Sequence, residues 1–466
     1  MRIKFSKINT QWYIFIFAIL TICVLASKSL DSGIIMGLIM ALFMFLSILK
    51  NNDFTFDFFL ICTIFQNIIL VLVASGVSSK DTTLIILMKE LTIYICMIFS
   101  FIKRELINFD RKTCCFIAFL LLSVVEILRG GNIKLAIISL RQIIIIFSCF
   151  YFGASLKIRN IGKIYMNIVA GAVFVGVIGI VLYFFSDQNW INIGYDLFWA
   201  NKTSGNSSFS FTNFYTYDFG FKLKRIVSTF VEPLSCSHFI GAGFVIAFFL
   251  IPKRYILKMF IALVLLMGFT KSSVVLFGCM IGVYIYTKIK KPSGKVVFWA
   301  LFVLTIALGF SYLVIKLNNL SYASSTSNHF YAFMYGVENA TLLGNGLGTA
   351  GYNAYMMGLK DYNSAYNESF FSLCIAQIGI IGVVLIYVFC GLCIVNAYKM
   401  YIKYKDKYIL ISLILCIDVV VESLFSASSV SMLGTGLYLV LNGITYNRVR
   451  EGKVYENWSD NISCSS

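Results

Sequence analysis

The feature that most constrains this chain is a series of apolar runs, each long enough to cross a membrane, that recur along its length. Hydrophobic residues make up 59% of the 466 positions, and charged residues only 13%. A bilayer core of about 30 Å takes about 20 helical residues, whereas the strands of a membrane barrel give a much weaker alternating pattern. The sequence therefore predicts an all-α, polytopic integral membrane protein.

The apolar runs predict about 12–14 transmembrane helices. Between them lie short polar connections and two long ones, at 186–234 and 317–368. The predicted spans cover residues 12–27, 33–49, 58–76, 84–102, 114–128, 133–152, 163–185, 235–251, 256–270, 272–287, 296–316, 369–396, 408–427 and 431–447.

Topology explains the formal charge of +17 better than a nucleic-acid partner does, because the basic residues lie between spans and not on a soluble face. With the N-terminus in the cytoplasm, 25 of the 38 Lys and Arg residues fall inside and 11 outside. This bias follows the positive-inside rule. The thirteen cysteines form no CxxC motif, so we interpret them as small buried hydrophobes and expect no metal site.

Six regions follow from this topology. Helices at 1–185, 235–316 and 369–447 alternate with the long loops at 186–234 and 317–368, and a cytoplasmic tail covers 448–466. Both long loops fall on the outer side and are rich in Asn, Ser, Tyr and Phe. Their aromatic content favours ordered caps over disorder, and loops of this length are usually functional.

The first long loop ends in FKLKRIVSTFVEP, which places Lys222, Lys224 and Arg225 together on the side that disfavours basic clusters. Arg grips a phosphate with its planar fork and Lys adds a point charge. The alternative is an anchor to lipid headgroups. Glu232 before Pro233 is typical of a helix start, although the carboxylate is also a candidate base. The sequence assigns no role to His238.

The second long loop contains GNGLGTAG, with a formal GxGxxG at Gly346, Gly348 and Gly351. A dinucleotide fingerprint needs a preceding strand and a following helix, and an outer loop between spans provides neither. We expect these glycines to allow tight turns or a close approach of the backbone to a ligand.

Charged residues inside the predicted spans need partners, because a lone charge facing lipid is costly. For Arg141 the candidate partners are Glu126 on the preceding span, and Asp418 with Glu422, which share one helix face. A structural ion pair and a ligand or proton pathway remain alternative interpretations. Lys89 and Glu90 lie within another span, or at its end if that span is shifted.

Glu368 stands where the second loop re-enters the membrane, in YNESFFSLCIAQIGIIG. A carboxylate there is either a helix-cap charge or a general base whose pKa is raised by partial burial. His329, in the same loop, is an alternative base.

Three stretches in order resemble the bacterial O-antigen and capsule repeat-unit polymerases and the related O-antigen ligases. RIVSTFVEP is similar to the family's Arg-containing segment before a span, FTKSS to its short turn between two spans, and GNGLGTAG with NESFFSLCIAQIGIIG to its Gly-rich loop and re-entry helix. The resemblance covers about residues 225–385. It implies a GT-C-like fold in a bacterial plasma membrane, with both termini cytoplasmic.

The resemblance implies a metal-independent glycosyltransferase without a cofactor, whose partners are a polyprenyl-diphosphate-linked oligosaccharide, membrane lipid and a chain-length regulator. Glu368 stands where ligases carry His, which favours a polymerase; Lys271 stands in the family's Ser-Arg turn. The implied roles are Glu368 as base and Arg225, Lys224, Lys222, Arg141 and Lys271 at the diphosphate, with His329 or Glu232 as the alternative base. Loop aromatics that would stack on sugars are Tyr215, Tyr217, Tyr352, Tyr355 and Tyr362. A ligase and a lipid-linked sugar flippase remain alternatives.

Overall fold

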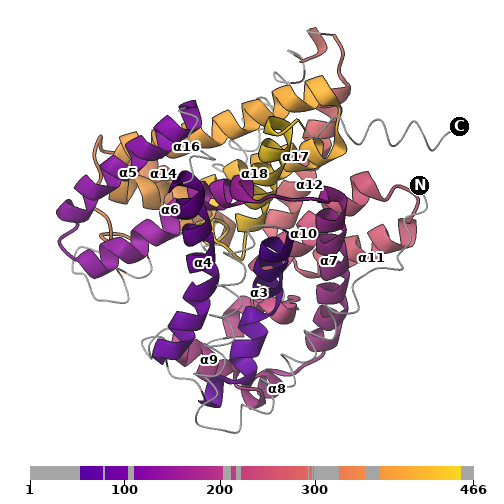
Figure 1. The fold of residues 1–466 in the computed structure, drawn as a ribbon. Coiled ribbons are helices and arrows are strands. Elements are labelled where there is room, and N and C mark those ends of the chain that lie inside the picture. The colour runs from indigo at the N-terminus through magenta and orange to yellow at the C-terminus, as the bar shows by residue number, and fades with distance from the viewer. Residues whose placement is uncertain are drawn as a thin grey trace, which may run out of the picture.

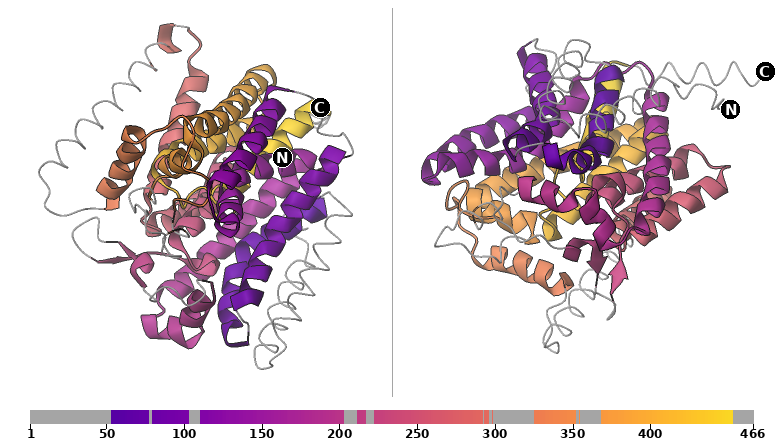
Figure 2. Two further views of the ribbon diagram at one scale, coloured as in Figure 1. Left: turned by 90° about the vertical axis from the view of Figure 1, so that its left-hand side faces the viewer. Right: turned by 90° about the horizontal axis from the view of Figure 1, so that it is seen from below.

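The computed structural model is a bundle of helices that pack at varied angles (Figures 1 and 2). It describes residues 53–76, 79–102, 110–202, 211–216, 222–291, 293–295, 298, 325–351, 354 and 368–452. In these ranges the chain is mostly helical, and its one small sheet has two short strands. The all-α prediction is confirmed for this part of the chain.

Eleven of the predicted spans coincide with helices, and the spans at 12–27, 33–49 and 296–316 lie outside the described residues apart from position 298. The helices are α3 (Asp53–Leu72), α4 (Ser79–Ile102), α5 (Arg111–Arg129), α6 (Ile133–Ser155), α7 (Ile161–Tyr183), α10 (Pro233–Leu250), α11 (Tyr255–Met267), α12 (Lys271–Lys288), α16 (Phe370–Tyr404), α17 (Lys407–Phe425) and α18 (Gly436–Arg450).

Seven helices in the described part are long and apolar enough to cross a membrane, namely α3, α4, α6, α7, α10, α16 and α17, with α4 counted from Ile85. The multi-pass prediction is therefore confirmed, while the total of 12–14 spans stays a prediction. The described cysteines are free and most are buried, as predicted.

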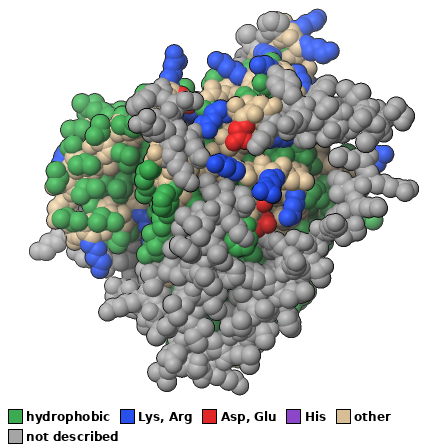
Figure 3. Space-filling view, viewed as in Figure 1, with side chains coloured by type: hydrophobic (Ala, Val, Ile, Leu, Met, Phe, Trp, Pro, Cys, Tyr) green, Lys and Arg blue, Asp and Glu red, His purple; other side chains and the backbone are tan. Residues whose placement is uncertain are grey.

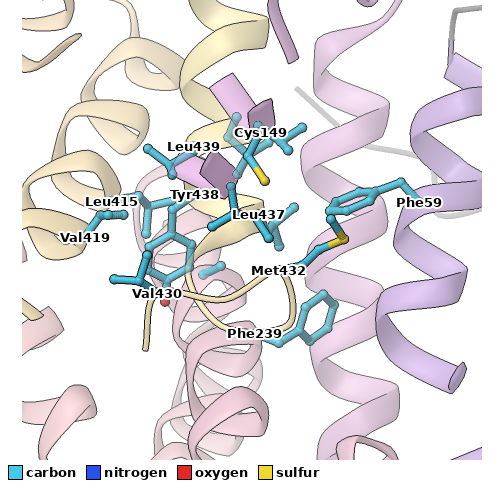
Figure 4. Close-up of a cluster of buried hydrophobic side chains, with 14 of the residues drawn as sticks. Phe59, Cys149, Phe239, Leu415, Val419, Val430, Met432, Leu437, Tyr438 and Leu439 are labelled. Carbon is cyan, nitrogen blue, oxygen red and sulfur yellow. The ribbon is translucent and has the colours of Figure 1, made fainter. Parts of the chain in front are cut away.

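Part of the core lies where α18 packs against α6 and α17, and Figure 4 shows Tyr438, Leu437, Leu415 and Cys149 among its buried side chains. Small residues bring α6 and α18 together. A Cβ atom on Gly153 would lie 2.0 Å from the Val440 carbonyl oxygen, and one on Gly443 would lie 2.0 Å from that of Phe150. Helices in membranes associate by such close approach, because lipid provides no hydrophobic force between them.

The alternating topology predicts which helix termini lie on the same side of the membrane. In the structure, termini predicted on one side contact one another. At one end of the bundle, Asp53 accepts a hydrogen bond from the Arg159 N–H at 3.0 Å, and Arg448 lies 3.9 Å from Asp406. At the other, the Ile226 N–H donates to the Met267 carbonyl at 3.1 Å. We call these the basic end and the loop end. In Figure 3 most visible Lys and Arg side chains gather in the upper half, and apolar side chains cover the left-hand part, where α5 lies.

The first long loop forms an ordered cap at the loop end, as predicted for its described part. It contains α8 (Asp187–Asn192), α9 (Tyr195–Lys202), η3 (Phe211–Phe214), and the strands β1 (Tyr215–Thr216) and β2 (Leu223–Lys224). Its aromatic side chains pack together, with Trp190 and Tyr195 each against Phe214 at ring separations of 5.2 and 4.9 Å. Tyr217, Tyr352, Tyr355 and Tyr362 lie outside the described residues.

Helix α16 is not the uninterrupted span that the sequence predicts at 369–396. Gly379 takes φ +66° and ψ −173°, which breaks the helix. The freed backbone groups are bonded by the second long loop: Ile380 N–H donates to the Thr341 carbonyl at 2.9 Å, and Asn345 N–H donates to that of Ala376 at 2.8 Å. Non-helical backbone at membrane depth is stable only where protein or water satisfies it in this way.

The Gly-rich segment of the second loop lies against the turn between α5 and α6. A Cβ atom on Gly346 would lie 2.4 Å from the Gly130 nitrogen, and one on Gly348 would lie 2.8 Å from that of Ala136. The buried Gln377 side chain accepts from the Gly348 N–H at 2.8 Å and donates to the Ala350 carbonyl at 3.2 Å. The backbone approached here is that of the turn between α5 and α6, and an approach to a ligand stays a prediction.

Candidate functional site

A buried ionic cluster lies where α10, α12 and α17 meet, and its centre is His238. The Nε2 atom of His238 lies 2.5 Å from Oε2 of Glu422 and 3.2 Å from the Ser272 hydroxyl. The Tyr438 hydroxyl of α18 donates to the His238 carbonyl at 2.7 Å. The His238 and Glu422 side chains are 0% and 3% exposed, so solvent cannot screen their interaction.

Asp418 belongs to the same cluster, one helical turn before Glu422 on α17. Its side chain is fully buried, and neither carboxylate oxygen has a hydrogen-bond partner of ordinary geometry among the described residues. Its polar neighbours are the Glu422 carboxyl and the Cys279 thiol. Two carboxyl groups and one imidazole thus share an apolar interior, where intramembrane ionisable groups usually have a function.

Arg141 pairs with neither of its predicted partners. Its Nε atom lies 3.2 Å from Oε2 of Glu90 on α4, while Glu126 binds Arg129 at 2.9 Å. The predicted partners were therefore wrong, because α4 packs against α6 beside Arg141 and α17 carries its carboxyls to His238 instead. Lys89 and Glu90 lie in the middle of α4, not at its end.

The two bases that the sequence offers as alternatives in the second loop are in contact. His329 lies on α14 (Ser325–Glu338), and its Nδ1 atom is 3.4 Å from Oε2 of Glu368 and 3.0 Å from the Glu368 carbonyl oxygen. The Glu368 side chain is 50% exposed. Behind it, Ser369 caps α16 and donates its hydroxyl to the Leu424 carbonyl of α17. A carboxylate held by an imidazole and open to solvent suits proton transfer.

The lysines of the first loop have partners within the loop. Lys222 lies 3.8 Å from the centre of the Tyr215 ring, whose hydroxyl donates to Asp187 at 2.7 Å. Lys224 donates to the Phe185 carbonyl. Burial lowers the pKa of Lys224, and the charge of Asp187 opposes that shift. Their predicted binding of a diphosphate would compete with these contacts.

Arg225 precedes a buried turn that the sequence motif builds. The Arg225 N–H donates to the Phe214 carbonyl at 2.8 Å, and the chain then enters the helices through η4 (Ser228–Phe230). Ser228 has φ +49° and its hydroxyl donates to the Val175 carbonyl at 2.6 Å. The Asn67 amide donates to the Phe230 carbonyl at 2.8 Å. RIVSTFVEP is therefore a fixed turn, which determines where Arg225 lies.

Glu232 begins α10, and Pro233 occupies its first turn, as the helix-start interpretation predicts. Its carboxylate accepts a hydrogen bond from the Ser235 hydroxyl at 2.8 Å. This local contact explains the carboxylate without catalysis, and its alternative role as a base stays a prediction.

Lys271 is next in sequence to Ser272 of the His238 cluster, and backbone hydrogen bonds join the segments of Arg225 and Glu368 to the ends of α11 and α17. Lys271 begins α12 directly before Ser272, and the Ile226–Met267 bond joins the Arg225 segment to the end of α11, four residues before Lys271. Glu368 joins α17, because its carbonyl accepts from the Ala427 N–H at 3.3 Å. Arg141, on α6, pairs with Glu90 of α4 instead.

Sequence reasoning left His238 without a role because its partner lies 184 residues away. The available signal was a histidine that begins an apolar run, combined with an Asp–Glu pair four apart in another run. Among the described residues, no group of three or more His, Cys, Asp and Glu side chains has the arrangement to hold a metal ion. No protein-family model matches the chain, and no curated protein matches it in sequence.

Proposed function

We propose that the protein is a glycan polymerase that joins oligosaccharide repeat units carried on a polyprenyl diphosphate, at the outer face of a bacterial plasma membrane. The observation that carries the proposal is the contact between His329 and the half-exposed Glu368, 3.4 Å apart. The motif resemblance supplies the reaction, including the GT-C-like fold and the chain-length regulator as a partner. The multi-pass helical bundle is the setting that this reaction needs.

In the proposed reaction, an acceptor sugar hydroxyl attacks the anomeric carbon of the lipid-linked chain. The new glycosidic bond forms as the bond to the diphosphate oxygen breaks, and the lipid diphosphate leaves with the bonding electrons. Glu368 takes the hydroxyl proton, and His329 positions its carboxylate. The protein must also align the two substrates and stabilise the charge on the diphosphate.

Arg225 and Lys271 are the proposed diphosphate ligands, because their segments are joined at the loop end by the Ile226–Met267 hydrogen bond. The planar fork of Arg225 suits two phosphate oxygens, and Lys271 adds a point charge. Lys222 and Lys224 add positive charge to the same loop. Arg141, already paired with Glu90, is proposed only as a deeper supporting charge.

A transporter is the second candidate, and the break in α16 at Gly379 favours it. Transporters of lipid-linked or small substrates often bind them at broken helices near the membrane midplane. Here, however, the N–H of Ile380 and the carbonyl of Ala376 bond to the second loop. Both backbone groups at the break are therefore already hydrogen-bonded within the protein, which favours the polymerase.

Three variants test the proposal in a strain that lacks the native gene. Glu368→Gln removes the proposed base, and Arg225→Ala removes the guanidinium group proposed to bind the diphosphate. Each variant should abolish long polysaccharide ladders at normal protein levels. Arg225→Lys keeps the charge and should restore only part of the product. Glu338→Gln is the matched control, because it changes an exposed carboxylate at the end of α14, the helix that carries His329.

Long ladders from both Glu368→Gln and Arg225→Ala would overturn the residue assignment. The accumulated material separates the alternative functions. Single repeats on the carrier at the outer leaflet indicate a lost polymerase, whereas long chains left on the carrier indicate a lost ligase. Substrate held on the inner leaflet indicates a lost flippase.

A further inference from the structure

We propose that Asp418, Glu422 and His238 form a proton-binding site inside the helical bundle, in which Asp418 carries a proton that it exchanges through the loop end. The proposal rests on the buried cluster and does not depend on the polymerase reaction. Its ligand is the proton itself, bound between two carboxyl groups one turn apart on α17.

The first step is a count of charge. His238 lies 2.5 Å from Glu422, so an imidazolium there neutralises one carboxylate. Asp418 is a second carboxyl in the same interior, and neither of its oxygens has a hydrogen-bond partner of ordinary geometry among the described residues. An uncompensated buried charge is strongly unfavourable. Asp418 is therefore neutral when Glu422 is paired with His238, and neutrality requires a bound proton.

Among the described residues, the Asp418 and Glu422 carboxyls form an ion pair with no Lys or Arg side chain. The groups that face the cluster from the packed helices are the Cys279 thiol of α12 and the Tyr438 hydroxyl of α18, with Glu232 at the start of α10 acting on His238. Tyr387 of α16 bonds Ser423 on α17, and His329 of α14 contacts Glu368 instead. Lys271 begins α12 beside Ser272. Among the described residues, no group of three or more His, Cys, Asp and Glu side chains is arranged to hold a metal ion.

The cluster lies close to the loop end of its helices. The Ser272 hydroxyl lies 3.2 Å from His238 at the start of α12, and the Glu422 carbonyl accepts from the Ser426 N–H at 2.8 Å where α17 ends. The N–H of the next residue, Ala427, donates to the backbone carbonyl of Glu368. The cluster thus lies about one turn of α17 beneath the rim, where a proton can enter and leave.

Infrared difference spectroscopy of the purified full-length protein in lipid nanodiscs tests the site. As the pH is raised, the carbonyl stretch of one protonated carboxylic acid should disappear, and this band should be lost in Asp418→Asn. Glu126→Gln is the matched control, because Glu126 is equally buried but bonded to Arg129; this variant should keep the band. An unchanged spectrum in Asp418→Asn would overturn the proposal.

A second measurement on the unmodified protein covers the case in which Asp418→Asn does not fold. An apolar carbodiimide adds to protonated, not ionised, carboxyl groups, and peptide mapping by mass spectrometry locates the adduct. Labelling should concentrate on Asp418 and decline as the pH rises. Labelling that favours Glu126, or that is independent of pH, would contradict the site. Loss of labelling on adding NaCl at constant pH would show that sodium, not a proton, is the occupant.

Discussion

Two ion pairs within the described bundle join residues of different helices. Arg141 of α6 binds Glu90 of α4 at 3.2 Å, and His238 of α10 binds Glu422 of α17 at 2.5 Å. Removing one member of such a pair leaves the other buried without compensation, which costs about 3–5 kcal/mol in fully buried cases. These two pairs therefore help to hold α6 against α4 and α10 against α17.

Asp110 at the basic end gives a pH-dependent prediction. It caps α5, accepting from the Thr113 N–H at 2.9 Å, and it contacts Lys112 at 3.3 Å and the Tyr446 hydroxyl at 3.2 Å. Burial alone would raise the pKa of Asp110, but the Thr113 hydrogen bonds and Lys112 outweigh it, so the pKa lies below its usual range. Asp110→Asn keeps a capping oxygen but removes the charge beside Lys112, and it should cost about 0.2–1 kcal/mol at neutral pH, as for an ion pair that is not fully buried.

A lowered pKa in the folded state stabilises the protein above the unfolded-state pKa, and this contribution disappears as the pH falls through the folded-state pKa. Thermal unfolding of the detergent-solubilised protein should therefore show a difference between wild type and Asp110→Asn that is constant near neutrality and shrinks in acid. A difference that persists at the most acidic pH would contradict the assigned charge interaction.

The element that departs most from its sequence pattern is α16, whose break at Gly379 is held by the second long loop. A side chain at Gly379 would need φ +66°, and its Cβ would lie 2.5 Å from the Leu342 carbonyl oxygen. The atoms nearest this Cβ belong to the backbone of Leu342, Leu343 and Gly344, which cannot move aside cheaply. The loop and the broken helix are therefore one structural unit.

Gly379→Ala should lower the free energy of unfolding by at least about 1–2 kcal/mol from the left-handed conformation alone, with the backbone clash in addition. Gly391→Ala in the same helix is the matched control, because a Cβ there meets nothing within 4 Å; it should be neutral or stabilise by about 0.5–1 kcal/mol. Thermal melts in one detergent compare the two. Equal effects would show that the break is not constrained.

Across the whole molecule, helix ends that the sequence predicts on the same side of the membrane also contact one another in the structure. If the loop end faces outward, Ser428→Cys should react with a membrane-impermeant maleimide in intact cells, since Ser428 lies in the turn after α17. Lys405→Cys, between α16 and α17, should react only after permeabilisation. Both substitutions require a background without the exposed Cys114. The reverse labelling pattern would invert the topology.

Hydropathy and turn chemistry predicted most helices and the ordered first loop, because these depend on neighbours in sequence. The same reasoning placed Glu368 and His329 in one loop, and Arg225 and Lys271 near helix starts. It missed the His238–Glu422 pair, the Glu90 partner of Arg141 and the break at Gly379. Each of these depends on tertiary contacts between distant segments, which no local pattern encodes.

The most direct test of the central claim is reconstitution of the purified protein in liposomes with a polyprenyl-diphosphate-linked repeat unit. The account predicts a ladder of longer glycans that forms without added divalent metal and is lost with Glu368→Gln and Arg225→Ala but kept with Glu338→Gln. Movement of the substrate across the bilayer without any lengthening would contradict it.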